Sequence, residues 1–257
     1  MLTCYRPVSD TAVASTPEFW TDTFARTQPL GARRRRYYAN GPEMKLIRRF
    51  IPAGGRVLDA GSGEGSWVAF LREQGFAAVG LDYSQPMVDE ARRRYPIGEF
   101  VQGDIRATGL APDSCDGIVS WGVIEHDPDG MLPALCEVSR IVKPGGRIVV
   151  TVPADHARQR ALVAAEQRSY GDARLGLFQY CFTPGELRDE VEKSGFNPLE
   201  AGELAIVSPE MLLPGFYVRF GKSRYVVKAL QLLSLLSRPN AENTMMNYCV
   251  AEKAQSV

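Results

Sequence analysis

The sequence predicts an α/β protein whose central sheet is mostly parallel and carries helices on both faces. Between residues 43 and 153, short apolar runs alternate with amphipathic stretches, which is the pattern of a parallel sheet covered on both sides. The first apolar run ends in a glycine-rich turn, as expected where a strand passes directly into a helix. A length of 257 residues suits one large domain of this class or such a domain with a small appendage.

The first strand is expected in the stretch Arg56 to Gly65, as an apolar run that ends in the acid Asp59 and is followed by the alternating glycines Gly61, Gly63 and Gly65. Glycine lacks a Cβ and adopts positive φ readily, so this turn lets a ligand approach the backbone. The helix expected over Ser66 to Glu73 directs its free N–H groups toward the same point. The turn therefore indicates a binding site.

The spacing of the glycines distinguishes two kinds of nucleotide site. A dinucleotide fingerprint is G-x-G-x-x-G, and its helix receives a pyrophosphate. Here the pattern is G-x-G-x-G, with Asp59 before it and Glu64 inside it. Two carboxylates would repel a diphosphate, whereas they suit a ligand that carries an ammonium or a sulfonium group.

Further strands follow in order. Ala77 to Asp82 ends in an acid at about the distance where α/β nucleotide sites place a ribose-binding carboxylate. The third strand lies within Glu99 to Ile105, and the fourth is Asp116 to Trp121. A helix, a Lys-Pro-Gly-Gly turn and the fifth strand occupy residues 137–152.

This ordered set resembles the class I S-adenosylmethionine-dependent methyltransferases. Val57 to Gly65 is similar to the first motif of the family, and EVSRIVKPGGRIVVTVP resembles its later helix, turn and strand, especially in the small-molecule branch that includes quinone-biosynthesis enzymes. The resemblance covers residues 43–153 well and the remainder loosely. It implies a Rossmann-like sheet of seven strands, mostly parallel with an antiparallel last strand, and S-adenosyl-L-methionine as cofactor, with S-adenosyl-L-homocysteine as product.

The resemblance also implies roles for individual residues. Asp59 and the glycine turn are expected to contact the methionine part of the cofactor. Asp82 is expected to bind the ribose, and Asp104 with Ile105 the adenine. Trp121 is expected beside the methyl group or the acceptor. Met87 and Tyr38 are either cofactor contacts or packing residues. The full expected cofactor set is Asp59, Gly61, Ser62, Gly63, Gly65, Asp82, Tyr83, Met87, Asp104, Ile105, Trp121 and Tyr38.

His126 is the candidate catalytic residue. It follows the carboxyl end of the fourth strand, where open α/β sheets hold ligands, and a neutral imidazole can take a proton from a phenol or an alcohol. The alternative is that His126 only orients its loop. His156 is assigned no role. No metal is expected, because none of the five cysteines forms a C-x-x-C pair and free thiols fit a reducing compartment.

The remaining sequence divides into an N-terminal helical segment, residues 1–42, and a methyltransferase domain, residues 43–257. Pro17 to Arg26 is expected to be helical. Thr183, Pro184 and Glu186 predict a capped helix that ends near Gly195. Two antiparallel strands are expected near Leu199 to Val207 and Met245 to Glu252.

The insertion between these two strands, residues 208–243, is unusually long. Its helical stretch 223–237 has a broad apolar surface and one narrow polar stripe. We interpret it as a lid over the substrate, with peripheral contact with a membrane or a dimer interface as the rival interpretations.

The charge balance and the lack of targeting signals bear on which partners and which cellular location are expected. Lysine plus arginine and aspartate plus glutamate both number 30, so bulk charge predicts no nucleic-acid partner. The run Arg33 to Arg36 is interpreted as a solvated helix face or loop, with an anion site or a membrane contact as alternatives. The start of the chain has no apolar signal region, and no apolar run is long enough to span a bilayer, so a cytoplasmic location is expected.

The functional prediction is a methyltransferase that acts on an O, N or C nucleophile of a small, apolar or lipid-linked acceptor. A nicotinamide-dependent oxidoreductase shares the strand, the glycine turn and the distal acid, but the glycine spacing and the lack of a Y-x-x-x-K dyad oppose it. A non-catalytic module that binds S-adenosylmethionine is the third hypothesis. The acceptor, the atom methylated and the oligomeric state are not determined by the sequence.

Overall fold

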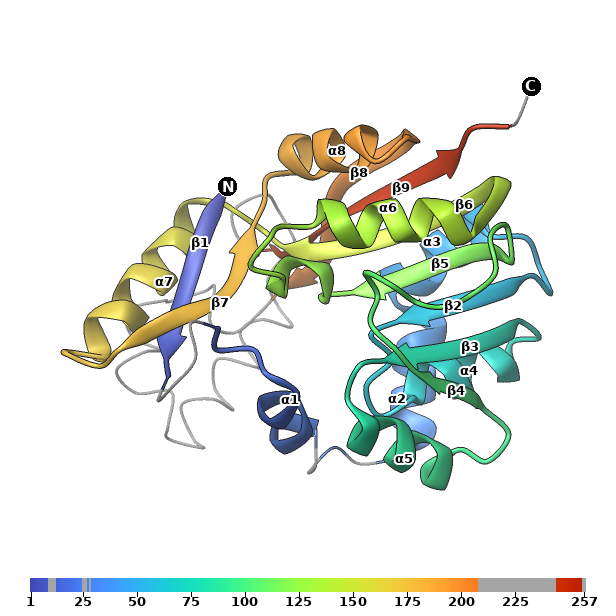
Figure 1. Cartoon of the computed structure of the whole chain (residues 1–257), viewed down its shortest axis with the longest axis horizontal. Coiled ribbons are helices and arrows are strands. Elements are labelled where there is room, and N and C mark those ends of the chain that lie inside the picture. Colours follow the sequence, from blue (N-terminus) through green and yellow to red (C-terminus); the bar gives the residue numbers. More distant parts are fainter. Residues whose placement is uncertain (9–12, 25–26, 28, 208–243, 256–257) are drawn as a thin grey trace.

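The computed structural model describes residues 1–8, 13–24, 27, 29–207 and 244–255 (Figure 1). The insertion 208–243, with the predicted lid or membrane contact at 223–237, lies outside the described residues. No helix within the described ranges is both long and apolar enough to cross a bilayer.

The main sheet has seven strands in the order β4-β3-β2-β5-β6-β9-β8. Strands β2 to β6 pair in parallel, and β9 is antiparallel to both β6 and β8. The predicted architecture, a mostly parallel sheet with an antiparallel last strand, is confirmed. The strands are β2 (Arg56–Ala60), β3 (Ala77–Asp82), β4 (Glu99–Gln102), β5 (Cys115–Trp121), β6 (Val142–Pro153), β8 (Phe196–Val207) and β9 (Thr244–Lys253).

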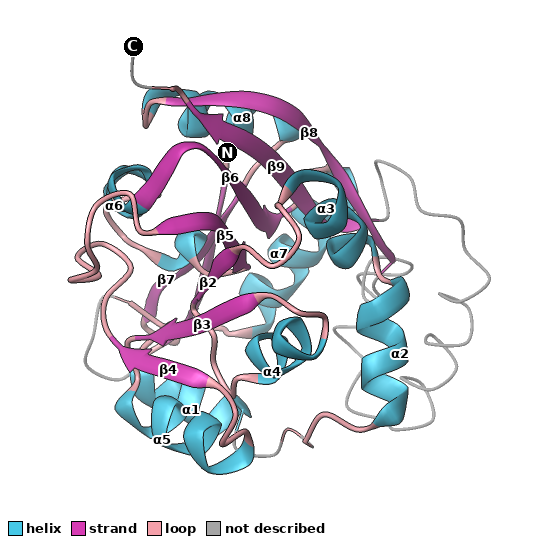
Figure 2. Cartoon of the chain, turned by 90° about the vertical axis from the view of Figure 1, so that its right-hand side faces the viewer, coloured by secondary structure: helices cyan, strands magenta, loops and turns pink. Residues whose placement is uncertain are grey.

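Alternate residues of each strand point to opposite faces, so the sheet has two apolar cores. On β2, Leu58 packs in the core under α6 and α8, while Val57 packs in the core under α2, α3, α4 and α5. Figure 2 shows helices on both sides of the sheet. The covering helices are α2 (Ala32–Asn40), α3 (Pro42–Phe50), α4 (Ser66–Glu73), α5 (Gln85–Arg94), α6 (Leu132–Ile141) and α8 (Pro184–Lys193).

Helix α8 begins with the predicted capping box. The Thr183 hydroxyl accepts from the backbone N–H of Glu186, and the Glu186 carboxylate accepts from the backbone N–H of Thr183 at 2.9 Å. The helix ends before Gly195, whose φ of +89° is a left-handed value. This helix was predictable because both of its ends are determined by local sequence.

A second sheet, which the sequence analysis did not predict, joins the N-terminal strand to a strand that precedes α8. Strand β1 (Leu2–Pro7) pairs antiparallel with β7 (Leu175–Cys181), and α7 (Ala157–Ser169) packs against β1 (Figure 1). Helix α1 (Pro17–Phe24) begins where it was predicted. The small sheet and α1 both lie beside the carboxyl ends of the parallel strands, next to the cavity described below (Figure 1).

Candidate functional site

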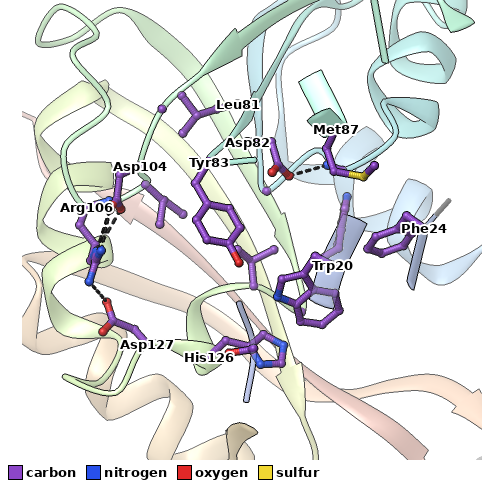
Figure 3. A pocket seen from close by; sticks show the side chains of 18 of the residues that line it. Trp20, Phe24, Leu81, Asp82, Tyr83, Met87, Asp104, Arg106, His126 and Asp127 are labelled. Atoms are coloured by element: carbon purple, nitrogen blue, oxygen red, sulfur yellow. Dashed lines mark hydrogen bonds and ion pairs between the residues drawn. The ribbon is translucent and has the colours of Figure 1, made fainter. Parts of the chain in front are cut away.

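A cavity of about 250 Å³ lies at the carboxyl ends of β2, β3 and β5 (Figure 3). It gathers most of the residues predicted to hold the cofactor, together with the candidate base. The predicted residues that line it are Gly61, Gly63, Asp82, Tyr83, Met87, Asp104, Ile105, Trp121 and His126. Asp59, Ser62, Gly65 and Tyr38 are not among its lining residues.

The glycine turn forms one wall of this cavity. Gly61 and Gly63 have φ values of +87° and +50°, which favour glycine. A Cβ on Gly61 would lie 2.4 Å from Val123, whereas the nearest atom to a Cβ on Gly63 would be a ring carbon of Phe24 at 3.9 Å. Gly61 is therefore required for packing, while Gly63 leaves its backbone open to the cavity.

Asp82 is held in a fixed orientation at the end of β3. The backbone N–H of Gly63 donates to one carboxylate oxygen at 2.8 Å, and the N–H of Ser84 donates to the other at 2.9 Å. Burial raises the pKa of Asp82, and these two hydrogen bonds oppose that rise. Each oxygen keeps a second lone pair, so the carboxylate can accept from two neighbouring hydroxyl groups.

Asp104 lies across the cavity from Asp82 and is paired with Arg106 (Figure 3). The guanidinium lies 2.6 Å from one Asp104 oxygen and 3.4 Å from Asp127. Hydrogen bonding from Arg106 lowers the pKa of Asp104. Arg106 and Asp127 line the cavity but were not predicted, because nothing in the local spacing shows that one arginine joins two loops.

Asp59 is buried beside the cavity. The residue is 2% exposed, and its Oδ1 has no hydrogen-bond partner among the described residues. Burial, and then the nearby charges of Asp82 and Glu64, raise the pKa of Asp59 to about 8. A carboxyl group in this state gains from any cation that approaches it.

Glu64 does not supply the ligand-facing charge that the glycine motif suggested. Its carboxylate pairs with Arg34 at 2.7 Å and with Arg94 at 3.6 Å. Arg34 belongs to the arginine run, which lies on α2 with its residues exposed or half-buried, so one member of this helix face is also an ion-pair partner of the turn. Arg35 of the same run pairs with Glu73.

Tyr38 and Gly65 do not line the cavity and instead pack against neighbouring side chains around the turn. The Tyr38 ring stacks on Trp67 with centroids 4.1 Å apart, and its hydroxyl lies 3.0 Å from that of Ser66. A Cβ on Gly65 would lie 2.7 Å from the Phe100 ring, so this glycine permits close packing of the helix. Of the two roles weighed for Tyr38, these contacts are those of a packing residue.

His126 lies in a short 3₁₀ helix, Ile124–His126, and borders the cavity. Its Nδ1 lies 2.6 Å from the backbone oxygen of Phe178, an acceptor, so Nδ1 carries the proton. Burial, and secondarily the positive charge of Arg6, lower the pKa of His126 to about 4. The imidazole is therefore neutral near pH 7, with the lone pair on Nε2.

Helix α1 contributes two side chains, Trp20 and Phe24, that the sequence analysis did not place in the site. Trp20 and Phe24 stack with centroids 6.0 Å apart, and the edge of Trp20 meets the His126 ring at 4.8 Å. Both line the cavity. Their helix was predicted, but its position against a loop about 100 residues away depends on tertiary packing.

The fold and the cavity define a class: an α/β protein with a Rossmann-like sheet and a nucleotide-type site at the carboxyl ends of its strands. The chain belongs to the methyltransferase-domain family, whose family model matches residues 31–201. The family resemblance drawn from the glycine turn and the later motifs is confirmed.

One curated relative is the demethylmenaquinone methyltransferase of Beutenbergia cavernae, 39% identical over 98 residues. The match covers 38% of this chain and 40% of that protein, so the chain spans less than half of this relative's length.

Two solved structures share the fold. A TehB-like SAM-dependent methyltransferase from Corynebacterium glutamicum has a TM-score of 0.56 and 22% identity, covering 93% of this chain and 100% of that one. A Haemonchus contortus phosphoethanolamine N-methyltransferase 2, in complex with phosphomonomethylethanolamine and S-adenosylhomocysteine, has a TM-score of 0.59 and 20% identity, covering 94% of this chain and 61% of that one.

Proposed function

We propose that the protein transfers a methyl group from S-adenosylmethionine to an O, N or C nucleophile of a small acceptor. The observation that carries this proposal is Asp82, whose two carboxylate oxygens are oriented by the N–H groups of Gly63 and Ser84 beside an open glycine turn. Such a carboxylate suits the two hydroxyls of a ribose. The names of the similar proteins agree with the reaction type and differ in the acceptor.

The residues present fit this cofactor. Gly63 leaves room where a Cβ would otherwise project, and the unpaired Oδ1 of Asp59 lies behind the turn, where a positive group would stabilise it. Met87 and Ile105 offer apolar surface, and Asp104 offers an acceptor for an amino group. When bound, S-adenosylmethionine supplies a methyl group already activated by a positively charged sulfur. The protein's own task is then to position the acceptor and to exclude water.

His126 is proposed as the base when the acceptor is a hydroxyl. The Phe178 carbonyl fixes the proton on Nδ1, so Nε2 presents its lone pair at the border of the cavity. For an amine acceptor that is already neutral, His126 would serve only to orient the loop that connects β5 to α6.

Titration calorimetry with S-adenosylmethionine and with NADH tests the proposal. S-adenosylmethionine should bind and NADH should not. Asp82→Ala should weaken binding by about 1–3 kcal/mol, because it leaves the ribose hydroxyls unpaired, and Asp82→Asn should weaken it less, because the amide keeps one acceptor. Asp116→Asn is the matched control, since this acid lies on β5 and is paired with Lys143, away from the cavity. Equal affinities for all variants, or tight binding of NADH, would reject the proposal.

A further inference from the structure

A second cavity, of about 430 Å³, adjoins the first one. The two cavities share Trp20, Gly122 and His126, so they meet at the candidate base. The second cavity is walled by the small sheet and its helix, through Tyr5 of β1, Phe178 of β7 and Leu162 of α7. It therefore lies between the two sheets, on the side of His126 away from Asp82.

Two buried polar side chains of this cavity each have one oxygen without a hydrogen-bond partner among the described residues. Glu125 is 1% exposed and Gln159 is 7% exposed, and both line the cavity. These oxygens are Oε2 of Glu125 and Oε1 of Gln159. A buried polar atom without a partner is destabilising, so a ligand that hydrogen-bonds to both atoms is favoured.

The cavity favours an uncharged ligand. Burial raises the pKa of Glu125 well above its usual value, which favours the neutral carboxyl, a group that can both donate and accept. His126 is neutral as well. Arg6 stacks its guanidinium 3.6 Å from the centroid of the Phe178 ring, and Glu166 carries the opposite charge on the same wall. Charges of both signs therefore lie on the wall, and neither the carboxyl nor the imidazole adds another.

The aromatic residues determine the shape of the ligand. Trp20 and Phe178 line the cavity with their rings 29° from parallel, and Tyr5 lies on the same wall. Gly122 has a φ of +68°, and a Cβ there would lie 3.3 Å from both Glu125 and Met246, so this glycine keeps the passage between the cavities clear. Flat aromatic walls with hydrogen-bonding groups suit a planar ring that carries polar substituents.

We infer that the second cavity is the acceptor site and takes an uncharged aromatic compound with two hydroxyl groups. One hydroxyl donates to Gln159, and the other pairs with the Glu125 carboxyl beside Nε2 of His126. This inference rests on the proposed function, because it places the acceptor next to the cofactor residues. Glu125 and Gln159 are specificity residues in this account.

Ligand-observed NMR titrations of the protein saturated with S-adenosylhomocysteine test the inference with three probes: catechol, benzoate and benzylamine. Catechol should bind more tightly than the anion and the cation. Glu125→Leu and Gln159→Met should each weaken catechol binding by about tenfold, the equivalent of one lost hydrogen bond. Glu125→Gln should stay within about twofold of the parent, because a neutral amide replaces a neutral carboxyl. Glu125→Gln and Gln159→Met each nearly keep the size and shape of the original side chain. If Glu125→Leu does not fold, the expected tenfold loss in Gln159→Met, beside the unchanged affinity of Glu125→Gln, still tests the inference.

Glu43→Gln is the matched control, since Glu43 is also a buried carboxyl with an unpaired oxygen but does not line this cavity. Tighter binding of benzoate that disappears in Arg6→Gln would overturn the inference in favour of an anionic acceptor. Catechol binding that is equal in the parent, Glu125→Leu and Gln159→Met would overturn it as well. The same titrations are repeated without S-adenosylhomocysteine. Failure of S-adenosylhomocysteine to bind, with catechol binding retained, would contradict the proposed function and not the ligand class of the second cavity.

Discussion

Asp59 carries a proton in the folded protein over a pH range in which the unfolded chain does not. Its pKa in the fold is about 8, whereas an exposed aspartate releases its proton near about pH 4. Between these values the folded state binds more protons than the unfolded state, so this residue's contribution to stability falls as the pH rises. Asparagine does not titrate and has nearly the same shape.

We therefore expect Asp59→Asn to be more stable than the parent at pH 8, with the difference shrinking toward pH 5. Urea unfolding at both pH values, without cofactor, measures this. The same substitution should reduce the thermal shift produced by S-adenosylmethionine, because the amide has no charge for a sulfonium. A variant that is less stable than the parent at pH 8 would show that Asp59 has a stabilising partner.

The lowered pKa of His126 leads to a prediction about how activity depends on pH. With a folded pKa of about 4, its imidazole stays neutral throughout the range in which free histidine titrates. Methyl transfer to a hydroxyl acceptor should therefore show no loss near pH 6.5 and decline only toward pH 4. His126→Asn should lower kcat by about a hundredfold or more while leaving the affinity for S-adenosylmethionine nearly unchanged. An unchanged kcat would limit His126 to orienting its loop.

Single residues of the site were predictable where short-range spacing determines their position. Gly61, Gly63 and Asp82 follow from the strand, turn and strand pattern, and the structure brings them together. Arg106 and Trp20 were not predictable as site residues, because each reaches the cavity through contacts made between distant loops.

At the scale of elements, Glu64 connects the glycine turn to two helices. Its side chain is 4% exposed, and it pairs with Arg34 of α2 and Arg94 of α5. Glu64→Gln would remove the buried carboxylate that pairs with both guanidinium groups, while Arg94 keeps its ion pair with Glu90. We expect a loss of roughly 1–3 kcal/mol in unfolding free energy, less than for a fully buried pair because Arg34 remains 31% exposed.

Glu73→Gln is the control for this substitution. Its partner Arg35 lies on the same helix α2, but both side chains are about two-fifths exposed, at 39% and 43%. An exposed pair contributes about 1 kcal/mol or less. Chemical denaturation of both variants should therefore show a clearly larger loss for Glu64→Gln, and equal losses would mean that burial of the Glu64 pair has no energetic effect.

Elements differed in how well the sequence predicted them. Helix α8 was predicted at both ends because its cap residues are local. Strands β1 and β7 were missed because each finds its partner about 175 residues away, so no pattern within either segment indicates the pairing. Helix α7 lies in a polar stretch whose apolar residues follow no clear helical period.

For the whole molecule, the two sheets should differ in local stability. The main sheet is buried on both faces, whereas the small sheet has two strands and a minor apolar cluster of Cys4, Val163 and Cys181 with Leu2. Native-state hydrogen exchange should show that amides of β1 open at a lower free energy than those of β2 and β5. Equal protection in all three strands would mean that the two sheets unfold as one unit.

The family resemblance predicts a mostly parallel sheet of seven strands with an antiparallel last strand, and the structure has that architecture. The division at residue 42 and the lid at 208–243 stay predictions. The second cavity was not predictable, because its walls come from β1, β7 and α7, whose arrangement no local pattern specifies.

The pairing of β1 with β7 also has a consequence for biosynthesis. Leu2 lies opposite Cys181, so β1 leaves the ribosome long before its partner exists. At roughly 5–20 residues per second, the wait is on the order of ten seconds or more. During that time the strand is an open edge to which another chain could add. The wall of the second cavity therefore forms late in synthesis, and a nascent chain stalled before residue 175 would contain the glycine turn and the parallel strands but not the closed pocket.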